Sequence, residues 1–91
     1  MSSNQGPDPK RSRLVERGQR FYDETLKSKL EPSDVGRFVA IEPESQRYFL
    51  DDNGTAALIA AHEAMPGHLF YLVRVGYGAA DTVSGYGSRV R

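Results

Sequence analysis

The stretch that decides the fold is residues 36–50, GRFVAIEPESQRYFL. Residues 37–41 are rich in β-branched and aromatic side chains and are apolar at both even and odd positions, which is typical of a strand covered on both faces. Residues 42–45 form a polar turn that contains proline, and residues 46–50 return to an apolar run. The stretch therefore predicts a β-hairpin with a loop of about four residues.

Two further strands are predicted downstream of this hairpin. Residues 68–75, HLFYLVRV, carry bulky side chains at every position from Leu69 to Val73, which indicates a strand in the sheet interior. Residues 80–84 lie between glycines and form a weaker strand pattern. We expect these two strands to form a second hairpin.

Two helices are predicted, one before each hairpin. The first begins near Pro9, where Asp8-Pro9 is a helix-start signal, and ends near Leu30, before Pro32. Its apolar stripe consists of Leu14, Val15, Phe21, Tyr22, Leu26 and Leu30. The second helix covers residues 55–65 and stops at Pro66-Gly67. Its N-cap candidates are Asp51, Asp52 and Asn53.

The element order α-β-β-α-β-β predicts an α+β fold. A right-handed crossover through the second helix makes the third strand run parallel to the second and antiparallel to the first. The simplest arrangement is a four-stranded antiparallel sheet of order 2-1-3-4, with two helices packed on one face of it. We expect residues 1–7 to be a disordered leader and residues 8–91 to form a single domain.

Composition excludes several function classes. The 91 residues carry 12 basic and 12 acidic side chains, and a neutral chain is not a general binder of nucleic acid or anionic membranes. The absence of cysteine excludes a disulfide framework, a thiol nucleophile and a thiolate metal site. No apolar run approaches the roughly 20 residues of a membrane span, and no apolar stretch follows the basic N-terminal residues as in a secretory signal. We therefore expect a cytoplasmic location.

The most reactive combination of side chains is in residues 62–68, HEAMPGH, where two imidazoles and a carboxylate are candidate zinc ligands and a candidate base. The segment resembles HExxPGH, the zinc signature of a group of large bacterial metallopeptidases, and it matches at His62, Glu63, Pro66, Gly67 and His68. Those enzymes continue with a helix, whereas this chain continues with a strand. We therefore expect no metal and no cofactor, with His62 beside the buried helix face, Glu63 in solvent and His68 at the start of the strand.

Glycine-interleaved aromatic residues and arginines near the C-terminal end are the residue types that anchor protein interfaces. They predict a partner-binding set of Arg74, Tyr77, Tyr86 and Arg89. No GxSxG motif surrounds a serine, so no catalytic nucleophile is predicted.

Two carboxylate pairs could be considered for acid-base chemistry, Glu42 with Glu44 and Asp51 with Asp52. Both pairs lie in predicted turns. We expect solvent to leave their pKa values near normal, so that they serve capping and solubility.

Residues 36–76 resemble small uncharacterised bacterial proteins that share a Gly-basic-Phe/Trp-Val-Ala hairpin, a helix and a closing apolar strand. Some of those proteins look antitoxin-like, being short, neutral and encoded beside a second small gene. The resemblance implies an interaction role and transfers no functional residue.

The leading hypothesis from sequence is a non-enzymatic protein-interaction module, antitoxin-like or an accessory subunit of a bacterial complex. A small core, the lack of a catalytic set and outer strands with open edges favour it, and the expected partner is another protein or a second copy of the chain. The alternative is a small zinc-dependent hydrolase or metal-binding protein that uses His62, Glu63 and His68. A third hypothesis is weak RNA binding through the basic ends, since residues 1–20 carry five basic and two acidic side chains.

Overall fold

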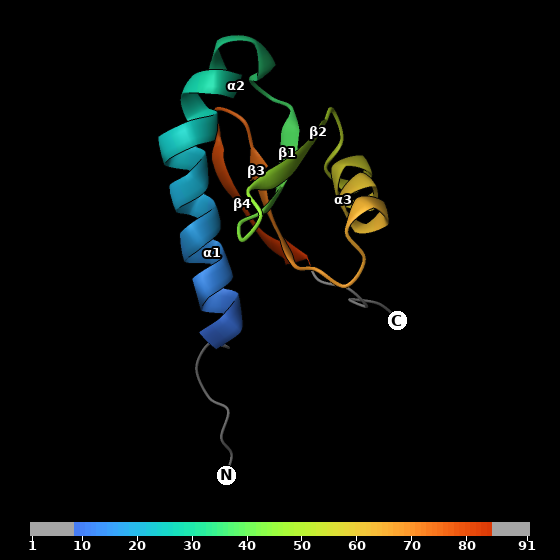
Figure 1. The fold of residues 1–91 in the computed structure, drawn as a ribbon. Helices are drawn as coiled ribbons and strands as arrows, with labels where there is room; N and C mark the ends of the chain where they lie inside the picture. Colours follow the sequence, from blue (N-terminus) through green and yellow to red (C-terminus); the bar gives the residue numbers. More distant parts are fainter. Residues whose placement is uncertain (1–8, 85–91) are drawn as a thin grey trace.

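The computed structural model describes the backbone of residues 9–84 and the side chains of residues 11–77. The helices and strands follow one another in the predicted order, and the N-terminal helical segment is continuous from Pro9 to Asp34 (Figure 1). The elements are α1 (Pro9–Phe21), a π-helical turn η1 (Tyr22–Leu26), α2 (Lys27–Asp34), β1 (Phe38–Glu42), β2 (Arg47–Asp51), α3 (Gly54–Ala64), β3 (Phe70–Arg74) and β4 (Gly78–Ser84).

The sheet is built around β1, which pairs antiparallel with β2 on one side and with β3 on the other. β2 and β3 therefore run in the same direction, as the crossover through α3 requires. The backbone of β4 runs antiparallel beside β3, which gives the order β2-β1-β3-β4 along the sheet.

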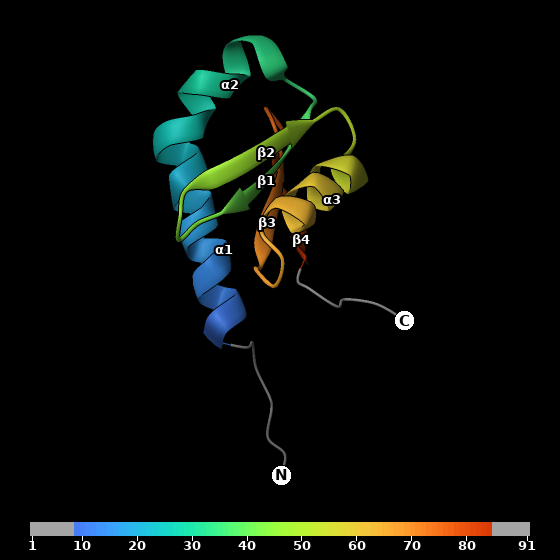
Figure 2. The ribbon, with the colours of Figure 1, turned by 45° about the vertical axis from the view of Figure 1, so that its right-hand side comes forward.

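The predicted fold class is right in its α+β content and wrong in its arrangement. We predicted a four-stranded antiparallel sheet of order 2-1-3-4 with both helices on one face. Three strands supply the described core side chains, and they lie in the order β2-β1-β3. The helices cover opposite faces, with α1, η1 and α2 on one face and α3 on the other (Figures 1 and 2). Because β1 and β3 are apolar at both parities, each face of the sheet needs a helix to cover it.

Alternate residues of the strands feed two separate hydrophobic clusters. On the face of the N-terminal helical segment the buried cluster contains Tyr22, Leu26, Leu30, Val39, Ile41, Tyr71, Val73 and Val75. On the α3 face it contains Ala40, Ala57, Ala61, Phe70 and Leu72. The three alanines of the second cluster are fully buried, and their small side chains allow α3 to lie close to β1.

The π-helical turn corrects a drift in the first helix. Its buried residues recur at every fourth position, at Leu14, Gly18, Tyr22, Leu26 and Leu30. In a regular α-helix four residues advance about 40° beyond one full turn, so this stripe would rotate away from the sheet. η1 contains an extra residue in its turn and rotates the stripe back. The sequence predicted the stripe but not the π turn.

Tyr22 connects the last part of the helical segment to the turn that follows β3. The buried hydroxyl of Tyr22 donates to Glu31 Oε2 at 2.9 Å and accepts from the Gly76 N–H at 3.2 Å. Burial and the neighbouring Glu31 carboxylate raise the pKa of Tyr22, although the Gly76 N–H opposes this. The predicted helix end near Leu30 is wrong, because α2 continues through Pro32 to Asp34.

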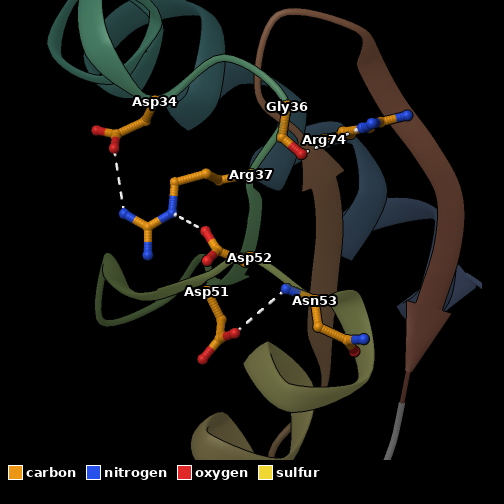
Figure 3. A network of polar contacts seen from close by, with 7 residues as sticks. All are labelled: Asp34, Gly36, Arg37, Asp51, Asp52, Asn53 and Arg74. Carbon is orange, nitrogen blue, oxygen red and sulfur yellow. Dashed lines mark hydrogen bonds and ion pairs between the residues drawn. The ribbon is translucent and has the colours of Figure 1, made fainter.

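A polar network joins α2, the start of β1 and the turn after β2 (Figure 3). Arg37 donates from Nε to Asp52 at 2.7 Å and from Nη1 to Asp34 at 3.2 Å. Asn53 is the N-cap of α3, since its side-chain oxygen accepts from the Ala56 N–H at 3.1 Å. These contacts fix the position at which β2 ends and α3 begins.

Candidate functional site

The two histidines of the HEAMPGH segment have different neighbours. The His62 ring lies edge-on to Phe70, with ring centroids 4.8 Å apart, so it packs against the α3-side cluster. His68 is exposed, and its Nδ1 lies 3.8 Å from Glu42 Oε2, which is too long for a hydrogen bond. Glu63 is exposed. Within residues 11–77 no three side chains of the metal-ligating types are grouped so that they could hold an ion.

A small cleft lies beside His68, between α1, the β1–β2 loop and the α3–β3 loop. Its volume is ≈ 220 Å³, below the range of about 300–1,000 Å³ for small-molecule pockets. Two arginines, Arg13 and Arg17, line it together with Glu42 and Glu44. Because the opposite charges balance, the cleft favours neither an anion nor a cation.

Glu42 is a buried carboxylate that organises the hairpin loop. Its side chain is almost inaccessible, and one oxygen accepts from the Ser45 N–H at 2.8 Å and from the Ser45 hydroxyl at 2.6 Å. Burial opposes ionisation, but these bonds, the Glu44 N–H and His68 hold the pKa of Glu42 below its ordinary value. The expectation of a solvated Glu42 with a normal pKa is therefore wrong. The Ser45 hydroxyl donates to a carboxylate rather than to a histidine, so the group is not an activated nucleophile.

Of the predicted partner-binding residues, Arg74 and Tyr77 lie together. The Arg74 guanidinium carbon is 4.3 Å from the Tyr77 ring centroid, and its Nε donates to the Gly36 carbonyl at 3.2 Å (Figure 3). Tyr77 is 64% exposed, so the stacked pair presents an aromatic surface to solvent. Tyr86 and Arg89 lie outside the described residues. The partner-binding role of the set stays a prediction.

The outer side of β2, from Arg47 to Asp51, is an open edge of the sheet and is called the β2 edge below. β2 pairs with β1 on its inner side, and no other described strand pairs with its outer side. Figure 2 shows β2 as the outermost strand at this end of the sheet. Its backbone N–H and C=O groups on that side form a template for a further strand.

The side chains of the β2 edge suit contact with another chain. Tyr48, Phe49 and Leu50 are each only half-buried, whereas Phe70–Val73 in the interior strand β3 are buried. No proline or lysine interrupts the strand, so two common protections of an edge are missing. The sequence indicated open sheet edges in general but singled out no residue of β2. The pattern that could have done so is the apolar triplet of residues 48–50, which has Arg47 on one side and Asp51 on the other.

Comparison with family models, curated proteins and solved structures finds no match for this chain. Among the helices that the structure describes, none combines the length and apolar character needed to cross a bilayer. The β2 edge is therefore defined as the candidate functional site from the residues and their geometry alone.

Proposed function

We propose that the chain is a non-enzymatic protein-interaction module that binds a partner strand along the β2 edge. The observation that carries this proposal is the open outer backbone of β2, flanked by half-buried apolar side chains. In such β-augmentation, main-chain hydrogen bonds supply affinity and alternate side chains supply specificity. Side chains of the added strand would contact Tyr48 and Leu50 on one face of the sheet and Phe49 on the other face.

The β2 edge is already formed within the single chain. All five residues of β2 are in register with β1, from Arg47 opposite Glu42 to Asp51 opposite Phe38. The Arg37–Asp52 ion pair, at 2.7 Å, holds the residue that follows the strand. A preformed edge lowers the ordering cost of binding, which supports a docking role.

The proposal is tested by site-specific photocrosslinking in the source cells. A photoreactive amino acid replaces Arg47, which is exposed on the β2 edge, and in a control variant it replaces Glu63, which is exposed on α3. We expect a discrete crosslinked protein, of any identity, from position 47 and not from position 63. Equal, diffuse crosslinking from both positions, or none from position 47, would contradict the proposal.

A further inference from the structure

The sequence of the β2 edge, RYFLD over residues 47–51, is complementary to itself when two copies lie antiparallel and centred on Phe49. Arg47 then faces Asp51 of the second copy, and Tyr48 faces Leu50. We propose that a second copy of this chain binds the β2 edge in this register and forms a two-fold symmetric dimer. This inference rests on the proposed function and names its partner.

Charge selects both the direction and the register of the pairing. In the antiparallel pairing the Arg47–Asp51 contact occurs twice, once at each end of the interface. A parallel pairing in the same position would place like charges opposite each other, which is destabilising. A shift by one residue would separate the charges and turn apolar side chains to the wrong faces. Only the arrangement centred on Phe49 therefore pairs both charges.

The two charged groups are available for such contacts. No ion pair within the described residues involves Arg47, whose guanidinium carbon lies 5.4 Å from the Phe49 ring centroid. One carboxylate oxygen of Asp51 accepts from the Asn53 N–H at 3.2 Å, and this leaves the second oxygen for an arginine. Asp52 differs, because it is already bound to Arg37.

The same register would extend both hydrophobic clusters across the interface. Tyr48 and Leu50 pack partly against the cluster under the N-terminal helical segment, and Phe49 packs partly against the cluster under α3. Directly opposite side chains in an antiparallel pair share a face of the sheet. Tyr48 would therefore cover Leu50 of the second copy on one face, and the two Phe49 rings would meet on the other. Such an isologous contact closes after two copies.

The test uses two full-length variants, Arg47→Glu and Asp51→Arg, in sedimentation velocity. Each variant alone would place like charges at both ends of the interface, and we expect its dimer dissociation constant to rise by at least about tenfold relative to the wild type. In an equimolar mixture one chain carries two negative ends and the other two positive ends, so all facing charges are opposite. We expect the mixture to recover dimers as heterodimers. A matched control, Lys27→Glu, alters an exposed charge near Tyr71 and Gly76 and leaves dimerisation unchanged.

Two results would overturn the inference. One is a wild-type protein that remains monomeric at about 1 mM, a result that needs no variant to fold. The other is a mixture of the two variants that stays monomeric although circular dichroism shows both to be folded. A monomeric wild type whose position 47 crosslinks to a different protein would refute the self-pairing and keep the proposed function. A monomer without a crosslink from position 47 would refute both.

Discussion

In the substitution Gly18→Ala, helix propensity and side-chain packing act on the free energy of unfolding in opposite directions. In an open helix, replacing glycine by alanine stabilises the fold by about 1 kcal/mol. Here the new Cβ would lie 2.7 Å from Cδ2 of Tyr71 and 2.9 Å from its Cβ and Cγ. The last two atoms are fixed close to the β3 backbone, so α1 or β3 itself must move. Overpacking costs about 1–3 kcal/mol, and three simultaneous close contacts place this case at the upper end.

The expected net result is a loss of about 1–2 kcal/mol of unfolding free energy, opposite in sign to the propensity effect. For a domain of this size each kcal/mol lowers Tm by about 4–8 °C, so thermal unfolding followed by circular dichroism resolves the change. Gln19→Ala, at the exposed neighbouring position, is the control and should stay within about 0.5 kcal/mol of the wild type. A Gly18→Ala variant as stable as the wild type, or more stable, would refute the close packing of α1 on Tyr71.

Three further changes are expected to alter stability, and one double change is expected to have only a small effect. Tyr22→Phe removes two hydrogen bonds and should cost about 1–2 kcal/mol in urea denaturation; an unchanged midpoint would contradict this. Leu72→Ala should cost about 2–5 kcal/mol, and an unchanged Tm would remove this side chain from the core. Because the pKa of Glu42 is lowered in the fold, its carboxylate stabilises the protein above its ordinary pKa of 4.5, and this stabilisation is lost as the pH falls through the lowered value. Glu42→Gln should therefore be less stable at neutral pH and lose less stability in acid, whereas parallel pH profiles would argue against the lowered pKa. Replacing His62 and His68 together by alanine should cost about 1 kcal/mol at most, and stoichiometric zinc in the wild type, measured by mass spectrometry and lost in this variant, would revive the zinc hypothesis.

The strands β1, β2 and β3 and their order β2-β1-β3 were predictable, because each of these strands has a strong local signal. The hairpin of residues 36–50 and the interior strand that begins at Phe70 each combine dense apolar composition with clear turn residues. The antiparallel pairing of β1 with both neighbours followed from the hairpin between β1 and β2 and from the helical crossover between β2 and β3. Such features depend on a few adjacent residues and on general chain geometry.

The arrangement of the helices was not predictable in the same way, because packing over the whole domain decides which face each helix covers. Apolar residues at both even and odd positions of β1 and β3 indicated that both faces of the sheet are covered. They did not indicate which helix covers which face. Glu42 illustrates a second limit, since it is buried and faces a cleft that α1, which is distant in sequence, also lines. The predicted order already placed the second strand at an edge of the sheet, but only the structure gives the register that puts Arg47 and Asp51 at the two ends of β2.

The π-helical turn also determines how many residues the helical segment can lose without turning its buried side chains away from the sheet. η1 has one residue more than an α-helical turn, so deletion of the exposed Thr25 would let it relax into regular α-helix, with Leu14 and Leu30 still facing the sheet. Deletion of a second residue, such as the exposed Ser28, would then rotate Leu30 by about 100° relative to Leu14, because a regular α-helix has no surplus residue left to release. The helical segment can therefore lose one residue between Leu14 and Leu30, but not two, and keep both side chains on the sheet.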